Sequence, residues 1–259
     1  MIRMFDFILE TFAVADAEVR KLIRDPTELL SRAVQPVLWM AIFGQVFSQV
    51  RGIPTGNLRY LDYMAPGILA QSILFSAIFY GIAIIWERDL GIVHKLLVTP
   101  AHRSSLIMGK AVAAGLRGLV QALVVYLIAI ALHVEIRWQL LPVLTVTAGV
   151  FIGSCIFSTF SLVIACIVKT RERFMGIGQV LTMPLFFASN AIYPLELMPG
   201  WLKIVAVCNP LTYLVDALRG AMIVGGQSIY AVSTSFAVML FVFALLLFLA
   251  TRLYPGLAH

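Results

Sequence analysis

Six long apolar stretches, almost free of charged residues, limit the fold of this 259-residue sequence more than any other feature. A helix that crosses the hydrocarbon core of a bilayer needs about 20 apolar residues, and each stretch is close to that length. We therefore predict an all-α integral membrane protein, a single domain over 1–259. The six transmembrane helices are expected at 33–50, 62–86, 111–134, 141–168, 174–193 and 229–251.

Composition and charge agree with a membrane protein. Hydrophobic residues make up 61% of the chain and charged residues 12%, whereas about 25% of residues are charged in soluble domains. The net charge of +6 could indicate nucleic-acid binding, but the basic residues neither gather on one face nor alternate with exposed aromatics. No nucleic-acid partner is expected, and the lipid bilayer is the predicted environment.

The distribution of Lys and Arg predicts the orientation. With six spans, 13 of the 19 basic residues fall on the side of both termini, 5 on the other side, and Arg117 within a span. Cytoplasmic loops are the basic ones, so both termini are predicted to be cytoplasmic. The first 32 residues contain charges every few positions, and no secretory signal is expected there.

The N-terminal 30 residues have the pattern of an amphipathic interfacial helix. Apolar residues recur at helical spacing from Phe5 to Ile23, and charged residues, Glu18 among them, are placed mostly on the opposite face. Asp25-Pro26-Thr27-Glu28 has the form of a helix start. The alternative is a soluble amphipathic helix docked on a partner.

Residues 194–228 fit neither a span nor an ordinary loop. Pro194, Pro199 and Pro210 interrupt the segment, while 204–215 carry no charge. Proline ends helices, so one straight spanning helix is excluded. Two short helices that enter the membrane and return are tolerated where they pack against protein or line a wet cavity. We predict an extracytoplasmic re-entrant helical hairpin between spans 5 and 6.

Polar residues inside the predicted spans are candidates for the lining of a translocation path. They are Gln45, Gln71, Arg117 and Gln179. Each Gln has the alternative role of an interhelical hydrogen bond. Arg117 either contacts a substrate or extends its long side chain back to the interface near Lys110, about 10 Å along the helix. Cys155, Cys166 and Cys208 have no paired or metal-type spacing and are interpreted as packing residues, so no metal site is expected.

The connection at 87–110 is the longest on the predicted cytoplasmic side. Leu90, Val93 and Leu97 are spaced as on one face of a helix, which predicts a short amphipathic helix. Such a helix can transmit force between a membrane domain and a cytoplasmic partner.

Three motifs together resemble one family. They are Glu-Arg-Asp-x-Gly-x-x-x-Lys-Leu-Leu-Val-Thr-Pro at 87–100, Asn-x-x-Tyr-Pro-Leu-Glu-x-Met-Pro-x-Trp-Leu at 190–202, and Asn-Pro-Leu-Thr-Tyr-x-x-Asp-x-x-Arg at 209–219. The chain resembles type 2 ABC-transporter permeases, the membrane subunits of ABC exporters, and is similar to the drug-resistance and nodulation-type members. Arg24-Asp25-Pro26 and Gln35-Pro36 also fit, so the likeness covers essentially the whole chain.

The resemblance implies two sets of site residues. A helix at 88–99 would dock on a nucleotide-binding subunit, with ATPase-coupling residues Glu87, Arg88, Gly91, His94, Lys95, Leu96, Thr99 and Pro100. Short re-entrant helices at 195–205 and 210–222 would border the substrate exit. Exit-gate residues would be Asn190, Pro194, Leu195, Glu196, Pro199, Trp201, Asn209, Pro210, Leu211, Thr212, Tyr213, Asp216 and Arg219. Ile92 and His94 depart from the Thr and acidic residue that family members often carry. Asp216 and Arg219, three apart, are expected to pair with each other.

No catalytic residues are predicted, because no motif for ATP hydrolysis or another reaction is present. The Gly109-Lys110 pair lacks the first glycine of a P-loop, whose place Ser104 takes, and Ala111 follows it. No His-Glu-x-x-His or Gly-x-Ser-x-Gly sequence occurs. The chain is therefore expected to hold no cofactor itself, with ATP and Mg bound by a separate ATPase subunit.

The expected function is export of a hydrophobic or amphipathic small molecule from a bacterial or archaeal cytoplasmic membrane. A second permease copy, identical or a close paralogue, would complete the path. Export of a polysaccharide, lipo-oligosaccharide or lipid by a permease of the same family is the first alternative. An ion-gradient-driven transporter is a different class, which usually has two related halves and carboxylates in its spans. A membrane-embedded enzyme lacks any catalytic motif here.

Overall fold

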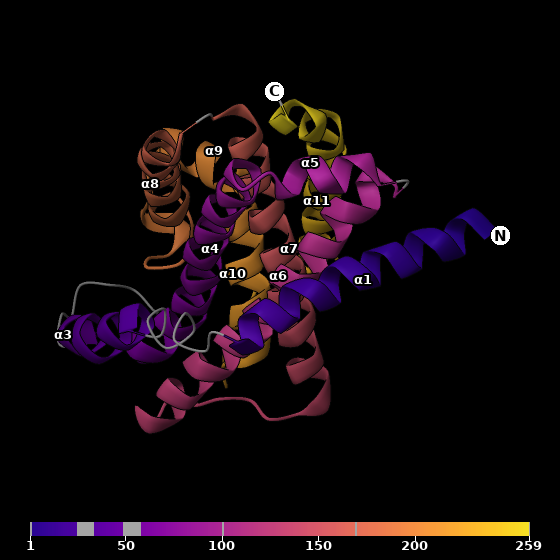
Figure 1. Ribbon diagram of the computed structural model, residues 1–259. Helices are drawn as coiled ribbons and strands as arrows, with labels where there is room; N and C mark the ends of the chain where they lie inside the picture. The colour runs from indigo at the N-terminus through magenta and orange to yellow at the C-terminus, as the bar shows by residue number, and fades with distance from the viewer. Residues whose placement is uncertain (1, 25–33, 49–57, 100, 169, 259) are drawn as a thin grey trace.

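The computed structural model describes residues 2–24, 34–48, 58–99, 101–168 and 170–258 (Figure 1). Across these ranges the chain forms helices and turns without strands, apart from one isolated β-bridge between Ile136 and Ile223. The predicted all-α class is confirmed. The elements are α1 (Ile2–Arg24), the π-helical η1 (Trp39–Phe43), α3 (Gly44–Ser48), α4 (Tyr60–Asp89), α5 (Ile92–Val98), α6 (Arg103–Ala131), α7 (Leu140–Ile167), α8 (Arg171–Phe187), η2 (Leu195–Leu197), α9 (Gly200–Cys208), α10 (Pro210–Met222), α11 (Val232–Leu253) and η3 (Tyr254–Ala258).

Four described helices, α4, α6, α7 and α11, are long and apolar enough to cross a membrane, or five spans if the bent pair α9–α10 counts as one. They coincide with the predicted second, third, fourth and sixth spans. The predicted first span contains a shorter apolar helix, Val34–Phe47, and its ends at 33 and 49–50 lie outside the described residues. Over the predicted fifth span, α8 ends at Phe187 instead of 193. Its first turn holds Arg171, Glu172 and Arg173, so only 14 residues follow them in the helix.

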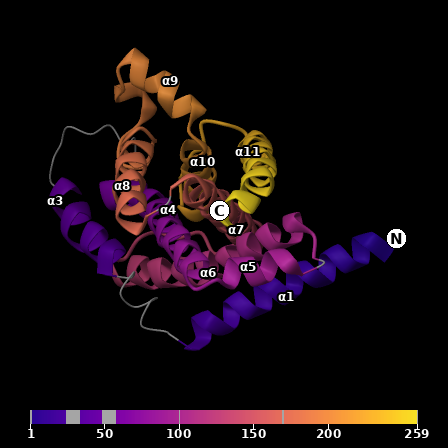
Figure 2. The same cartoon turned by 45° about the horizontal axis from the view of Figure 1, so that its top comes forward.

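Helix α7 lies in the middle of the bundle, with α4, α6, α10 and α11 packed against it (Figure 2). Small residues bring these helices close together. A Cβ built on Gly153 of α7 would meet Leu214 of α10 at 2.6 Å, and one on Gly118 of α6 would meet the side chain of Ser154 in α7. Close backbone approach of this kind compensates in lipid for the missing hydrophobic driving force between helices.

Helix α1 packs along α6 and runs obliquely across the bundle (Figure 1). Its exposed side carries Ile8, Leu9 and Phe12, as expected for an interfacial helix. The prediction that Glu18 lies on the polar, solvated face is wrong, because Glu18 is buried against α6. The helix start proposed at Asp25-Pro26-Thr27-Glu28 lies outside the described residues.

The segment 194–222 is broken as its prolines predict. After η2, α9 and α10 meet at Asn209 with a bend of 82°. Asn209 caps α10 by accepting a hydrogen bond from the Leu211 amide through Oδ1, and Pro210 takes the first helical position. Asparagine at the cap and proline at the first position are both favoured at a helix start, so the local sequence explains the break.

Candidate functional site

The coupling segment begins with a sharp turn between α4 and α5. Gly91 adopts φ +71°, a left-handed conformation that costs other residues roughly 1–2 kcal/mol. The turn folds α5 so that Val93 is fully buried and Leu96 is half-buried, while His94, Lys95 and Thr99 are exposed. Leu90 and Val98 remain 68% and 86% exposed. Pro100 lies outside the described residues.

The exposed end of α4 is tied to the start of α8. The Arg171 guanidinium donates to Asp89 Oδ2 at 2.8 Å and 3.1 Å, and it stacks over the Trp86 ring at 4.2 Å. Arg88 donates to Asp89 Oδ1 at 3.0 Å. Asp89, which the sequence reasoning did not select, therefore joins two helices that are distant in the chain.

Glu87 points inward, not toward a partner surface. Its Oε2 accepts from Lys110 Nζ of α6 at 2.6 Å, and its Oε1 accepts from Lys21 Nζ of α1 at 2.6 Å. On the opposite side of Lys110, Glu18 of α1 accepts from the same Nζ at 3.1 Å. Arg117 donates to Glu18 Oε2 at 3.2 Å and to the Glu18 backbone carbonyl at 3.2 Å. These five residues, 18, 21, 87, 110 and 117, form the ion network.

Four members of the ion network are buried and electrically balanced. Lys110, Arg117, Glu18 and Glu87 have side chains exposed by 3–11%, two positive and two negative, whereas Lys21 is half-exposed. Burial by itself raises the pKa of Glu18, but attraction by Lys110 and Lys21 outweighs it and lowers the pKa to about 2. The network thus joins α1, α4 and α6 at the end of α4, where the predicted coupling segment begins.

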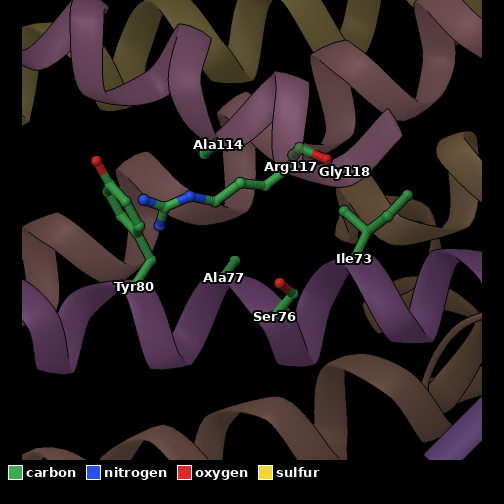
Figure 3. A pocket seen from close by; sticks show the side chains of 8 residues that line it. Ile73, Ser76, Ala77, Tyr80, Ala114, Arg117 and Gly118 are labelled. Carbon is green, nitrogen blue, oxygen red and sulfur yellow. The ribbon is translucent and has the colours of Figure 1, made fainter. Parts of the chain in front are cut away.

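Arg117 lines a small cavity between α4, α6 and α7 (Figure 3). Its guanidinium extends toward Tyr80, with Cζ 5.1 Å from the ring centroid. The cavity holds about 10 Å³, which is room for about one water molecule and far too little for a drug-sized substrate. In this conformation the positive charge of Arg117 is balanced by Glu18, within the protein. The other lining residues are Ile73, Ser76, Ala77, Tyr80, Ala114, Gly118 and Ser154.

The other candidates for a path are dispersed. Gln71 is buried in α4, whereas Gln45 on α3 and Gln179 on α8 are exposed. None of these three lines the Arg117 cavity. The described conformation therefore does not bring the four residues together.

The predicted exit-gate residues divide into a buried cluster and an exposed group. Asn190, Asn209, Leu211, Thr212, Tyr213, Asp216 and Arg219 are buried, as is Pro194. Glu196, Pro199 and Trp201 are exposed, and Leu195 and Pro210 are half-buried.

Backbone carbonyls hold the buried cluster together. Arg219 Nη2 donates to the Asn190 carbonyl at 2.6 Å, Arg219 Nε donates to the Tyr63 carbonyl at 3.4 Å, and the guanidinium stacks on the Tyr63 ring at 3.7 Å. Asn209 Nδ2 donates to the Leu185 carbonyl at 2.6 Å. These contacts join α4, the turn after α8, and α10.

The expected Asp216–Arg219 pairing is not what the structure shows. Asp216 Oδ1 and Oδ2 accept from the backbone amides of Ile229 and Tyr230 at 2.8 Å and 3.0 Å. Arg219 points to carbonyl oxygens instead. The spacing of three residues would allow Asp216 and Arg219 to pair on one helix face. The backbone amides of the loop after α10 also need acceptors, and they lie where the Asp216 carboxylate can accept from them.

The part of the chain that the structure describes contains no group of three or more His, Cys, Asp and Glu residues that could hold a metal ion. Cys155 is buried, Cys166 half-buried and Cys208 exposed, all as free thiols.

Sequence reasoning missed Glu18, Lys21, Lys110 and Tyr63 as members of these clusters. One signal was available for Lys110: it lies seven residues before Arg117 on the same face of a long apolar helix. Two cations on one face of an apolar helix indicate acidic partners from another element. Which element supplies them depends on the packing of α1.

Comparison with known proteins agrees with this architecture. Residues 10–223 match the family model described as ABC-2 type transporter. A Cyanophora paradoxa protein named as a transport permease, ycf38, is 31% identical over 221 residues, covering 83% of this chain and 74% of the relative. A Mycobacterium tuberculosis protein named as a doxorubicin resistance ABC transporter permease, DrrC, is 26% identical over 215 residues, covering 83% and 77%. The daunorubicin resistance permease DrrB1 of Streptomyces coeruleorubidus is 21% identical over 197 residues, covering 76% and 69%. The chain is thus a multi-pass membrane permease that belongs to the ABC-2 type transporter family.

Proposed function

We propose that this chain is the transmembrane subunit of an ATP-driven exporter that moves an amphipathic small molecule out of the cytoplasm. A separate ATPase subunit would bind ATP and Mg, and a second permease copy or close paralogue would complete the path. Family membership supports the proposal, because ABC-2 permeases generally work with a nucleotide-binding subunit. The observation that carries it is α5, a short helix with exposed apolar and basic residues that follows the end of α4, where Glu87 links α4 to α1 and α6 through the ion network.

Contacts at the two ends of the bundle support a six-span topology with a re-entrant hairpin. At one end, η3 near the C-terminus contacts α5, and Arg171 at the start of α8 contacts Asp89. At the other end, the Tyr60 hydroxyl donates to the Ile192 carbonyl, and the Val224 amide donates to the Glu135 carbonyl. Figure 1 shows α5 and the C-terminus together at the upper end and the α6–α7 connection at the lower end.

The segment between α8 and α11 therefore starts and finishes at the same end of the bundle. A segment that returns to its side of entry is a re-entrant element and not a fifth crossing. Helix α8 and the helix at 34–48 would complete six spans, with both termini in the cytoplasm. Reporter fusions that are active on one side of the membrane test this, placed after 198 and after 259. Equal activity at the two positions would refute the topology.

In the proposed coupling step, ATP-driven closure of the ATPase subunit pushes α5. The Gly91 turn is short, and Val93 is fully buried, so displacement of α5 reaches the end of α4. Glu87 at that end is bonded to Lys110 of α6 and Lys21 of α1. The three helices would then move together and open the exit near α9 and α10.

The names of two relatives support the proposed cargo class. Two relatives are named for resistance to doxorubicin and daunorubicin, which supports an amphipathic drug-like cargo. A panel that includes these two drugs and a lipid-linked glycan distinguishes the two export alternatives within the family.

The decisive experiment isolates the complex and disturbs α5 without disturbing the fold. Leu90→Glu and Val98→Glu change exposed apolar residues of the coupling segment, whereas Leu96 is half-buried and its substitution would mix docking with packing. Ile229→Glu is the matched control, since Ile229 is 51% exposed and follows α10 at the other end of the bundle. We expect a P-loop ATPase to copurify with the wild type and with Ile229→Glu, and its stimulation to be lost in the other two variants.

Two results would contradict the proposal. Wild-type ATPase stimulation in both Leu90→Glu and Val98→Glu would remove this segment as the coupling element. Transport of cargo by the chain alone in vesicles, driven by an ion gradient with no ATPase present, would favour a secondary transporter.

A further inference from the structure

The side-chain amide of Asn190 is buried without a hydrogen-bond partner in the part of the chain that the structure describes. The residue is fully buried, and both Oδ1 and Nδ2 lack a hydrogen-bond partner among the residues that the structure describes. A buried polar group without a partner destabilises the fold, and native structures contain few of them. Asn190 is nevertheless firmly placed, because its backbone carbonyl accepts from Arg219 and Tyr63.

Two more unsatisfied oxygens come from the elements around this turn. Thr212 Oγ1 and Gln71 Oε1 are buried and have no partner in the described ranges. Thr212 lies on α10 seven residues before Arg219, so the two share a helix face. Gln71 lies one turn beyond Gly67 on α4, and a Cβ on Gly67 would meet the Ala191 carbonyl. All three residues thus flank the junction of α4, the 188–191 turn and α10.

The turn itself is able to satisfy polar groups. The neighbouring Ser189 Oγ donates to the Phe186 carbonyl at 2.7 Å and accepts from the Ala191 amide at 3.3 Å. The Ser189 hydroxyl thus finds two partners within the turn, whereas the side-chain amide of Asn190 finds none among the described residues.

We infer that Asn190, Thr212 and Gln71 form a polar contact site for the cargo on the outward route, and that the described conformation has this route closed. The inference rests on the proposed export function and adds specific cargo contacts to it. In the open conformation the amide of Asn190 donates through Nδ2 to a carbonyl or hydroxyl oxygen and accepts through Oδ1 from a hydroxyl or amine. Closure removes these partners, and the Arg219 and Tyr63 contacts with the Asn190 carbonyl hold the closed turn in place.

The first test uses the purified chain alone in lipid nanodiscs. Asn190→Leu has nearly the same shape and removes both unsatisfied atoms, so its unfolding midpoint is expected to rise by about 2–4 °C, as is that of Thr212→Val. Ser189→Ala, in the same turn, loses two satisfied bonds and is expected to lower the midpoint. A lower midpoint for Asn190→Leu, like that of Ser189→Ala, would show that the amide has a partner and would overturn the inference.

The second test follows access to position 190 in the assembled transporter. Asn190→Cys is placed in a background without the three native thiols, and a charged methanethiosulfonate is applied from outside. Labelling is expected to be at least tenfold faster during ATP turnover than without nucleotide, and slower again with doxorubicin present. The exposed native Cys208, kept alone in a second background, should label equally in both states. Labelling at 190 that is insensitive to ATP, while Cys208 reacts, would overturn the inference.

The two tests separate failure of the inference from failure of the proposed function. Absence of any stimulated ATPase would refute the proposed function, and the stability test, which needs no partner, would still decide whether Asn190 is unsatisfied. If labelling depends on ATP but doxorubicin has no effect on it, the site opens to water but does not contact the drug. That result would overturn the proposed cargo contact.

Discussion

Removing the carboxylate of Glu18 tests whether α1 is held by a buried charge or by surface contacts. Glu18→Gln keeps the shape of the side chain but leaves Lys110 with Glu87 as its remaining acidic partner in the network and removes the carboxylate that faces Arg117. Breaking a buried pair by removing one partner costs about 3–5 kcal/mol. The lowered pKa gives a similar figure: a change from 4.5 to about 2 corresponds to about 3 kcal/mol in favour of the ionised form.

The matched control is Asp16→Asn on the same helix. Asp16 pairs with Arg20 at 2.7 Å, but the two side chains are 61% and 70% exposed, so this pair contributes less than about 1 kcal/mol. We expect Glu18→Gln to lower the free energy of unfolding by about 3 kcal/mol and Asp16→Asn by a few tenths. Denaturation of the purified protein in mixed micelles, followed by circular dichroism, measures both.

The pH dependence gives the same prediction a second readout. Because the pKa of Glu18 is lower in the folded protein, its contribution is fully present above about pH 4.5 and is lost as the pH falls toward 2. The stability difference between wild type and Glu18→Gln should therefore be constant from pH 7 to pH 5 and shrink below it. A difference under 1 kcal/mol at pH 7, or one that does not change down to pH 3, would refute the reasoning.

Substitutions at four further positions probe the backbone of the fold. Gly67→Ala places a Cβ 2.3 Å from the Ala191 carbonyl oxygen and should cost about 1–3 kcal/mol in the same denaturation assay, whereas Gly176→Ala in α8, where a Cβ meets open space, should stabilise by about 0.5–1 kcal/mol. Asn209→Ala removes the cap of α10 and should cost at least about 1 kcal/mol; an unchanged unfolding midpoint would exclude a structural role for the cap. Gly91→Ala strains the φ +71° turn by roughly 1–2 kcal/mol and should reduce ATPase stimulation, with Gly91→Asn less affected because Asn tolerates this conformation; equal loss in both would point to a cause other than the backbone.

Most of the architecture could be predicted from local sequence because bilayer physics acts locally. A helix in lipid satisfies its backbone hydrogen bonds within its own segment. The length of each apolar stretch was therefore enough to locate α4, α6, α7 and α11. Pro194, Pro199 and Pro210 predicted the break in the re-entrant segment, and the family resemblance implied a helix at 210–222, which are the observed bounds of α10. The turn at Gly91 likewise agrees with the freedom of glycine to adopt positive φ.

The charged residues could be assigned correctly only after packing was known. Glu18 has the position of a solvated residue on an amphipathic helix, yet it lies against α6, where Lys110 and Arg117 stabilise its charge. Asp216 was spaced to pair with Arg219, but the loop at 229–230 supplied its donors. A buried charge pairs with whichever polar group the packing of the helices places next to it. The separation of two residues in the sequence does not indicate which group that is.

The sequence by itself determined that this protein is a helical membrane permease, where its long helices lie, and where the chain breaks at proline and glycine. These properties depend on the length and hydrophobicity of each segment and on the conformational limits of single residues. Only the tertiary structure decided which buried charges pair across α1, α4 and α6, and that the side-chain amide of Asn190 is buried without a partner among the described residues. Those properties depend on contacts between residues 23 to 127 positions apart, and they are set by how the helices pack together.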